Sequence, residues 1–137
     1  MSQDQPKRSK GKGCLIACLL MIGLSAYTLW QIGAPARRAR LIHGRIQTGM
    51  NLDQVENVVK ETADRHYILY QVVTNGSWRT VSRDEFTRTC SAQTDLPTSA
   101  VRIHLTFMSS TPYRVSFFVQ FDKNGRVANV TAIHGWD

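Results

Sequence analysis

The sequence predicts an α+β fold in which an N-terminal transmembrane helix precedes two short helices packed on one face of an antiparallel β-sheet of three to five strands. Three observations lead to this prediction. Residues 14–34 carry no charge, the apolar residues of 36–62 recur at helical spacing, and from residue 66 the apolar period changes to two. The expected organisation is a basic cytoplasmic tail (1–13), a transmembrane helix (14–34), a juxtamembrane linker or helix (35–48) and an α+β domain (49–137).

The first predicted element is the membrane span, CLIACLLMIGLSAYTLWQIGA at 14–34. A helix rises 1.5 Å per residue, so about 20 apolar residues cross the ~30 Å core of a bilayer. Aromatic side chains near one end favour the headgroup layer, and Pro35 should stop or bend the helix. The side chains that we assign to the membrane lipid are Cys14, Leu15, Leu20, Leu24, Tyr27 and Trp30.

A cleaved signal peptide is the alternative to a retained anchor. Ala34-Pro35-Ala36 has the small-x-small form of a cleavage site, but the apolar run is longer than the ~7–15 residues of a signal peptide. Leu15-Ile16-Ala17-Cys18 resembles a lipoprotein cleavage box, which we interpret as a chance match because most of the apolar run follows Cys18. We therefore favour a retained anchor, and the sequence does not decide whether Cys14 or Cys18 is modified.

The positive charge lies beside the span and not in the folded part. The chain has a formal charge of +7, with 17 basic and 10 acidic residues. Segments 1–13 and 34–45 carry +3 and +4, whereas 46–137 has nine basic and nine acidic residues. A nucleic-acid-binding domain carries its basic patch on the folded surface, so we expect no nucleic acid as partner. Four basic residues precede the span and four follow soon after it, so the positive-inside count is balanced. A short basic tail usually stays in the cytoplasm, and on that ground we expect a single-pass inner-membrane protein with residues 37–137 on the extracytoplasmic side.

Two helices should follow the span. Residues 36–48 place Leu41, Ile42 and Ile46 at helical spacing, and Gly49-Met50 should end that helix. Asn51 with Gln54 has the spacing of a capping box that opens the second helix. We expect an apolar stripe facing the sheet (Leu52, Val55, Val58, Val59, Thr62) and a polar face toward solvent (Asp53, Glu56, Asn57, Lys60, Glu61).

The strands are predicted from alternation and turns. Residues 66–74 and 78–81 flank Asn75-Gly76, a strong hairpin turn. Ser82 and Glu85 form a second capping box before a short helical turn through Cys90, and a polar loop follows at 91–99. Three further strands are expected at 101–107, 113–121 and 126–134. Such alternation is typical of a sheet with one buried face and one wet face.

No arrangement of residues indicates catalysis, a metal site or a cofactor. Cys90 could be imagined as a nucleophile beside His66, His104 or His134, and strands could bring His104 and His134 together. The spacings of known metal and nucleophile motifs are missing, so we predict a protein that is not an enzyme. Three aromatic residues are instead the candidate partner-binding residues: Trp78 after a hairpin turn, Phe118 on a polar strand face and Trp136 near the chain end. A partner should meet the polar face of the sheet or the segment 75–99.

Two segments carry a resemblance to a known family. Thr48-Gly49-Met50-Asn51 followed by Val55 resembles the start of the second helix in the SmpA/OmlA (BamE-like) envelope lipoprotein family. Val119-Gln120-Phe121-Asp122 and then Asn124-Gly125-Arg126-Val127 with Val130 resemble that family's last hairpin, and the order of helices and sheet agrees over about residues 38–137. The chain departs from the family at Lys60-Glu61-Thr62-Ala63, in its longer segment 75–99 and in its transmembrane span.

The resemblance implies an extracytoplasmic, non-enzymatic domain that binds other envelope proteins or lipid, in envelope or outer-membrane protein assembly. Related units in inhibitor proteins bind enzymes, so a secreted, signal-cleaved inhibitor or envelope-protective binding protein is the alternative function. The sequence names neither the partner nor the oligomeric state, and a homo-oligomer is compatible with it.

Overall fold

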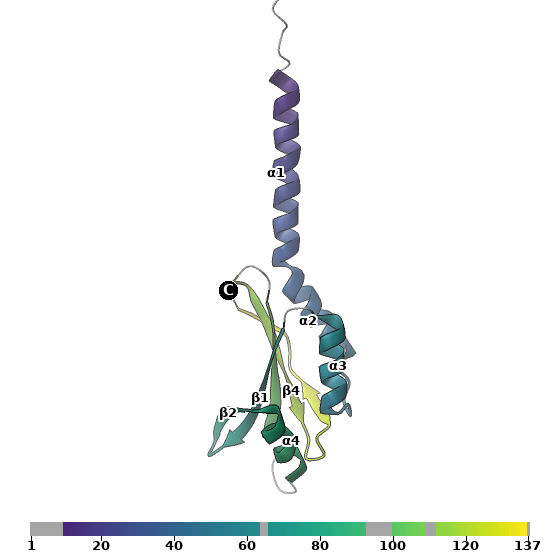
Figure 1. The fold of residues 1–137 in the computed structure, drawn as a ribbon, viewed down its shortest axis with the longest axis vertical. Coiled ribbons are helices and arrows are strands. Elements are labelled where there is room, and N and C mark those ends of the chain that lie inside the picture. The colour runs from purple at the N-terminus through teal and green to yellow at the C-terminus, as the bar shows by residue number, and fades with distance from the viewer. Residues whose placement is uncertain (1–9, 64–65, 93–99, 109–111, 137) are drawn as a thin grey trace, which may run out of the picture.

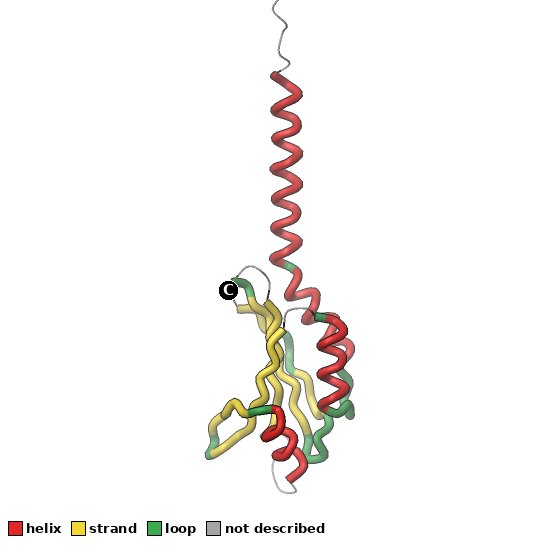
Figure 2. Tube along the Cα trace, in the orientation of Figure 1, coloured by secondary structure: helices red, strands yellow, loops and turns green. Residues whose placement is uncertain are grey.

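A computed structural model describes residues 10–63, 66–92, 100–108 and 112–136, without the side chains of 10–12 and 136. The predicted α+β fold is confirmed, with helices and strands arranged as Figures 1 and 2 show. The helices are α1 (Lys10–Ile32), α2 (Ala34–Arg45), α3 (Leu52–Thr62) and α4 (Arg83–Ala92). The strands are β1 (His66–Thr74), β2 (Ser77–Val81), β3 (Val101–Met108), β4 (Arg114–Phe121), β5 (Val127–Val130) and β6 (His134–Trp136).

Helix α1 is long and apolar enough to cross a membrane, and it extends away from the rest of the chain (Figure 1). None of its apolar window is buried, so this part of α1 is exposed along its length in the described molecule. Gly33 separates α1 from α2, so the spanning helix ends just before Pro35 as the sequence predicts, and Pro35 lies in the first turn of α2. Arg37 donates a 2.7 Å hydrogen bond to the carbonyl oxygen of Trp30 and lies 4.8 Å from its ring centroid, which ties the two helices together.

The sheet is antiparallel, with strand order β2-β1-β3-β4-β5 and with β6 also paired to β4. The single last strand predicted over 126–134 is two strands, β5 and β6. Between them Thr131 accepts a hydrogen bond from the Phe118 N–H through its side-chain hydroxyl at 2.9 Å, where a ladder would use a backbone carbonyl. The Thr131 N–H still donates to the Phe118 carbonyl at 2.9 Å, and beyond this residue the register with β4 shifts by one residue between Val119–Val130 and Ser116–His134.

Three helices, α2, α3 and α4, lie on one face of the sheet, one more than the sequence predicts. The short turn expected up to Cys90 is the ten-residue helix α4, and its Phe86 is fully buried against the rings of Tyr70 and Phe121. The alternation predicted for β3 and β4 is confirmed, because every second residue of both strands is buried. The largest fully buried core residues are Phe86, Phe107, Phe117, Phe121, Ile42, Ile103, Leu105, Val55, Val59, Val115, Val119 and Val127.

The predicted capping box of α3 is present, but Glu56 is not on its solvent side. Glu56 is only 5% exposed and accepts hydrogen bonds from the Tyr70 hydroxyl at 2.7 Å and from Arg83 Nε at 2.8 Å. Burial raises the pKa of Glu56, but the Arg83 and Tyr70 hydrogen bonds outweigh it and hold that pKa below its ordinary value. The prediction was wrong because α4, which brings Arg83 over this face, was not expected to be a full helix.

The two segments that carry the family resemblance lie side by side in the fold. Gly49 N–H donates to the Val127 carbonyl at 2.8 Å, and Val127 N–H donates to the Met50 carbonyl at 2.7 Å. Asn51 and Arg126 form an isolated antiparallel bridge. Gly49 has φ of +91°, a conformation that glycine adopts without strain, so this residue suits the close turn before α3. The entry to α3 and the last hairpin are thus one structural unit.

Candidate partner-binding face

The face of the sheet opposite the helices is uncovered in the described structure. We call it the open face. Register places corresponding residues of neighbouring strands on it, so that Gln71, Arg102 and Gln120 form one row. The next row contains Leu69, His104 and Phe118. Side chains directly opposite on adjacent antiparallel strands are close enough to interact, so these rows are continuous surfaces.

Trp78 and Phe118, both predicted as partner-binding residues, are brought together on the open face by Arg102. The Arg102 guanidinium carbon lies 3.8 Å from the Trp78 ring centroid and 4.0 Å from the Phe118 ring centroid. The His104 ring also stacks on Phe118, with centroids 4.5 Å apart and an interplanar angle of 24°. We call this group of side chains the aromatic–arginine stack: Trp78, Arg102, Phe118 and His104.

The guanidinium is held by a hydrogen bond as well as by the two rings. Arg102 Nε donates to Gln71 Oε1 at 2.9 Å. Its two Nη groups make no hydrogen bond to any residue in the described ranges, which leaves two donor groups for an external acceptor. Sequence reasoning missed this role of Arg102, although the alternation of β3 already placed it on the wet face.

The described residues of the open face carry positive charge. Arg102 and Arg114 lie on it, whereas the described acidic residues occur in α3, in α4 and in the turn that follows β4 (Asp53, Glu56, Glu61, Asp84, Glu85, Asp122). Burial lowers the pKa of Arg102, because the rings remove water from the charged form. The part of this face that the structure describes therefore presents cations without compensating carboxylates.

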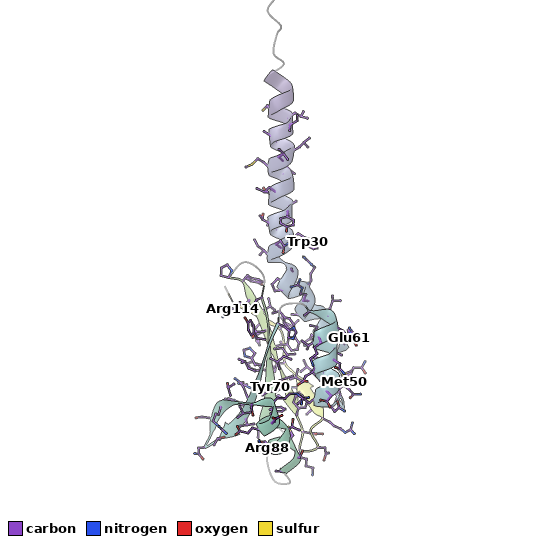
Figure 3. All side chains as sticks on the ribbon, viewed as in Figure 1. Trp30, Met50, Glu61, Tyr70, Arg88 and Arg114 are labelled. Atoms are coloured by element: carbon purple, nitrogen blue, oxygen red, sulfur yellow. The ribbon has the colours of Figure 1, made fainter. Side chains whose placement is uncertain are left out.

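An apolar depression of about 300 Å³ lies further along the open face. Leu69 and Tyr67 line it and are 40% and 60% exposed, which is high for residues of this size in a sheet. Thr106, Met108 and Arg114 complete its lining, and Figure 3 shows Arg114 at the end of the sheet near α2. Exposed apolar side chains beside fixed cations are typical of interaction surfaces.

The other predicted partner-binding features have mixed outcomes. Trp136 pairs in β6 with Arg114, so its backbone is at the same end of the sheet, but its side chain lies outside the described residues. Strand β2, which belongs to the predicted segment 75–99, is one edge of the sheet and is exposed except at Val81. Residues 93–99 of that segment lie outside the described ranges.

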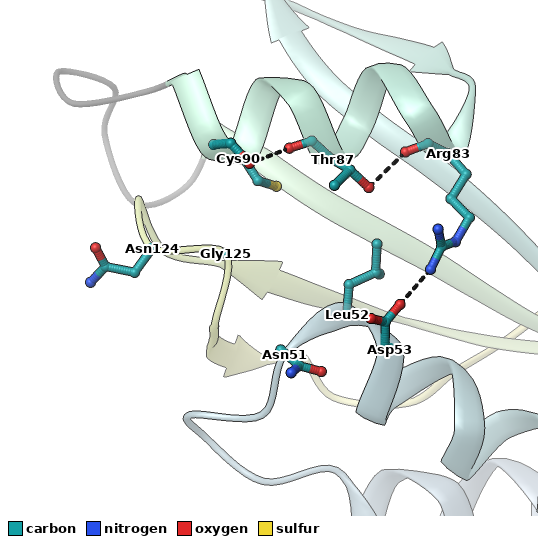
Figure 4. Close-up of a pocket in the computed structure, with 9 residues that line it drawn as sticks. Asn51, Leu52, Asp53, Arg83, Thr87, Cys90, Asn124 and Gly125 are labelled. Atoms are coloured by element: carbon teal, nitrogen blue, oxygen red, sulfur yellow. Dashed lines mark hydrogen bonds and ion pairs between the residues drawn. The ribbon is translucent and has the colours of Figure 1, made fainter.

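A second hollow, of about 270 Å³, lies between the start of α3, helix α4 and the turn before β5 (Figure 4). Arg83 crosses it to Asp53, as the dashed line in Figure 4 shows, so its one central cation is already neutralised. Cys90 borders the hollow, but burial raises the pKa of its thiol to about 11, which keeps the sulfur protonated and unreactive near neutral pH. We therefore interpret this hollow as imperfect packing and not as a binding site.

Cys90 and His104, considered from the sequence as a nucleophile and its base, lie on opposite faces of the sheet. Cys90 belongs to α4 on the covered side, whereas His104 is part of the aromatic–arginine stack on the open face. His66 donates a 2.9 Å hydrogen bond from Nδ1 to the Ala63 carbonyl at the start of β1, and His134 pairs opposite Ser116. Within the described ranges no three metal-binding side chains gather at one place.

His104 should make the stability of the domain depend on pH. Burial and then the charge of Arg102 hold the pKa of His104 below its ordinary value of 6.5. The unfolded chain therefore takes up this proton first, so the free energy of unfolding should fall as pH decreases from 6.5 through the lowered pKa. The His104→Gln variant should lose less stability than the wild type between about pH 7.5 and pH 5, measured by urea unfolding at both pH values. Equal losses in the two proteins would contradict the argument.

Comparisons of the chain with protein-family models, with curated proteins and with solved structures each gave no match.

Proposed function

We propose that the chain is a single-pass protein of the bacterial inner membrane whose extracytoplasmic domain binds other envelope proteins through its open face. The observation that carries the proposal is the combination of an exposed apolar helix with an uncovered sheet face that bears the aromatic–arginine stack. Helix α2 joins the two parts, because its buried Ala39 and Ile42 pack into the core while its first turn is bonded to Trp30. An anchor coupled in this way would hold the domain near the bilayer.

The surroundings of Ala34 and Pro35 favour a retained anchor over the secreted alternative. Both residues are buried in the first turn of α2, where the small-x-small sequence is helical. Proteolytic sites are typically exposed and flexible, so a buried helical segment is a poor substrate once the domain has folded. Cleavage behind Ala36 would also remove residues that pack against the domain.

The resemblance to the SmpA/OmlA family supports an envelope role and, within the proposal, the assembly of envelope or outer-membrane proteins. Its two motif segments pair through Gly49, Met50 and Val127, so they act as one unit in this fold. If the family shares these two motifs, its members would share the backbone pairing between the start of α3 and the last hairpin.

Location and processing are tested in one experiment on cells that express the chain with a C-terminal tag. Full-length protein in carbonate-washed membranes, with a tag that protease removes from spheroplasts, is the expected result. A soluble chain that begins at Arg37 would overturn the anchor and support the secreted inhibitor. A membrane-bound chain whose tag is protected would place the domain in the cytoplasm and overturn the extracytoplasmic role.

Binding through the open face is tested by photo-crosslinking in living cells. A photoreactive residue at Leu69, on the open face, should give discrete adducts with envelope proteins. The matched control is Asn57, which is exposed on α3 on the other side of the sheet and should give none. Adducts at Asn57 and none at Leu69 would mean that partners meet the helical layer instead.

A further inference from the structure

The open face has the chemistry of a receptor for carboxylates, and the aromatic–arginine stack provides it. The Arg102 guanidinium is fixed by rings on both sides and by Gln71, so its orientation is set before any partner arrives. A free arginine loses considerable side-chain freedom when it binds a carboxylate, whereas this one has already lost it on folding. Its unused Nη donors match the two oxygens of a carboxylate in spacing and plane.

Arg114 provides a second cation at the other end of the same face. Arg102 is opposite Gln120 in the register of β3 and β4, and Arg114 is six residues from Gln120 along β4. Six residues of extended strand correspond to about 20 Å. Between these two positions lies the apolar depression lined by Tyr67 and Leu69.

We propose that the open face binds an extended acidic protein segment, with one carboxylate on Arg102, a second about six residues away at Arg114, and an apolar side chain between them in the depression. This inference rests on the proposed function and names the chemistry of the partner. Charge complementarity decides the occupant, because the described part of the face has two arginines and no acidic residue. A basic or neutral segment would leave the partly buried Arg102 cation without a counter-charge.

The probe is a fluorescein-labelled nine-residue peptide, Gly-Glu-Ser-Gly-Ser-Leu-Gly-Glu-Gly, added to the purified full-length protein in detergent micelles. Its two glutamates and its leucine lie at even positions, so they share one side of an extended chain. Binding is measured by fluorescence anisotropy at two salt concentrations. A peptide with glutamine in place of both glutamates is the matched control ligand.

The expected result is saturable binding that weakens with added salt and is at least about tenfold weaker for the glutamine peptide. Arg102→Gln should weaken binding of the glutamate peptide by about thirtyfold, and Arg102→Lys by about tenfold, because an ammonium cannot bind a carboxylate with two parallel hydrogen bonds. Arg88→Gln is the control variant, since Arg88 is exposed on α4 away from the open face. It should leave the dissociation constant unchanged.

Three outcomes would overturn the proposal: no binding of the glutamate peptide, equal binding of the glutamine peptide, or equal effects of Arg102→Gln and Arg88→Gln. Concentration-dependent dimerisation that Arg102→Gln abolishes, measured by analytical ultracentrifugation, would assign the face to a second copy of the chain and would also overturn the proposal.

A second variant keeps the proposal testable if circular dichroism shows that Arg102→Gln does not fold. Trp78→Leu keeps the Arg102 cation but removes one ring that packs against it. It should weaken binding severalfold, and unchanged binding would count against the stack. The peptide measurement does not depend on membrane location, so it can fail while the fractionation succeeds, and the reverse.

Discussion

Phe117→Ala is expected to unfold the domain at a much lower temperature than Phe118→Ala, although the two residues are neighbours in β4. The Phe117 side chain is fully buried, and its ring centroid lies 5.9 Å from that of Phe107 and 5.2 Å from that of His43 in α2. Its removal loses the burial of a large apolar group and leaves a cavity, at a cost of about 3–5 kcal/mol. The free energy of unfolding of a typical domain is about 5–15 kcal/mol, so this loss is a large part of the total stability.

Phe118 lies on the open face, where truncation leaves no enclosed cavity. Its stacking with Arg102 and His104 should contribute about 1 kcal/mol in this half-exposed setting. We therefore expect a fall in melting temperature of at least about 15 °C for Phe117→Ala and of roughly 5 °C for Phe118→Ala. The measurement is thermal unfolding of the purified full-length proteins in detergent, followed by circular dichroism.

The same pair of variants separates folding from binding. Phe118→Ala should lose Leu69 photo-adducts while the domain stays folded, because Phe118 forms one wall of the aromatic–arginine stack. Similar melting temperatures for the two variants would mean that Phe117 and Phe118 are equally buried. The sheet would then not have one covered and one open face at β4, and the fold as described would be wrong. Full adduct formation by Phe118→Ala would show that the partner does not use the stack.

The difference between these neighbours was predictable from the sequence because it depends on the period of two. The alternation of β3 and β4, the hairpin at Asn75-Gly76 and the capping box at Asn51 are local patterns, and all are confirmed. The alternation of β4 also placed Phe118 on the wet face, whereas Trp78 was assigned only to the strand after the hairpin turn. The main-chain conformation agrees, since Asn75 and Gly76 have the positive φ values that a tight two-residue turn requires.

The features that could not be predicted involve contacts between distant segments. Glu56 was assigned to solvent because its helical position is polar, and its burial is explained by hydrogen bonds from Tyr70 and Arg83, which lie 14 and 27 residues later in the chain. The aromatic–arginine stack likewise joins Trp78 of β2 to Arg102 of β3, which are not adjacent strands. Alternation predicts the face on which a residue lies, but not how far a long side chain reaches across it. The sequence therefore indicated the polar face of the sheet and Phe118 on it, but not the arginine that joins Phe118 to Trp78.

Placing arginines in the middle of α1 should release the chain from the membrane without affecting the domain. Leu20 and Leu24 are 69% and 65% exposed, lie one helical turn apart and occupy the centre of the predicted span. Exchanging a leucine for an arginine at the centre of a span costs about 3 kcal/mol, so the Leu20→Arg, Leu24→Arg double variant should lose about 6 kcal/mol of insertion free energy. We expect it in the soluble fraction after carbonate washing, with its C-terminal tag protected from protease added to spheroplasts.

The conservative double variant Leu20→Ile, Leu24→Ile keeps the apolar surface and should fractionate as the wild type does. Both variants should keep the melting temperature of the wild-type domain, because the membrane window of α1 is not buried by any described part of the protein. A charged variant that still resists carbonate extraction would show that α1 does not cross the bilayer and that the domain is held there by another surface. Loss of the domain's melting transition would instead show that α1 packs on the domain, which contradicts its exposure. Membrane insertion and folding are thus separable in this chain, since one depends on the apolar surface of α1 and the other on the core beneath α2, α3 and α4.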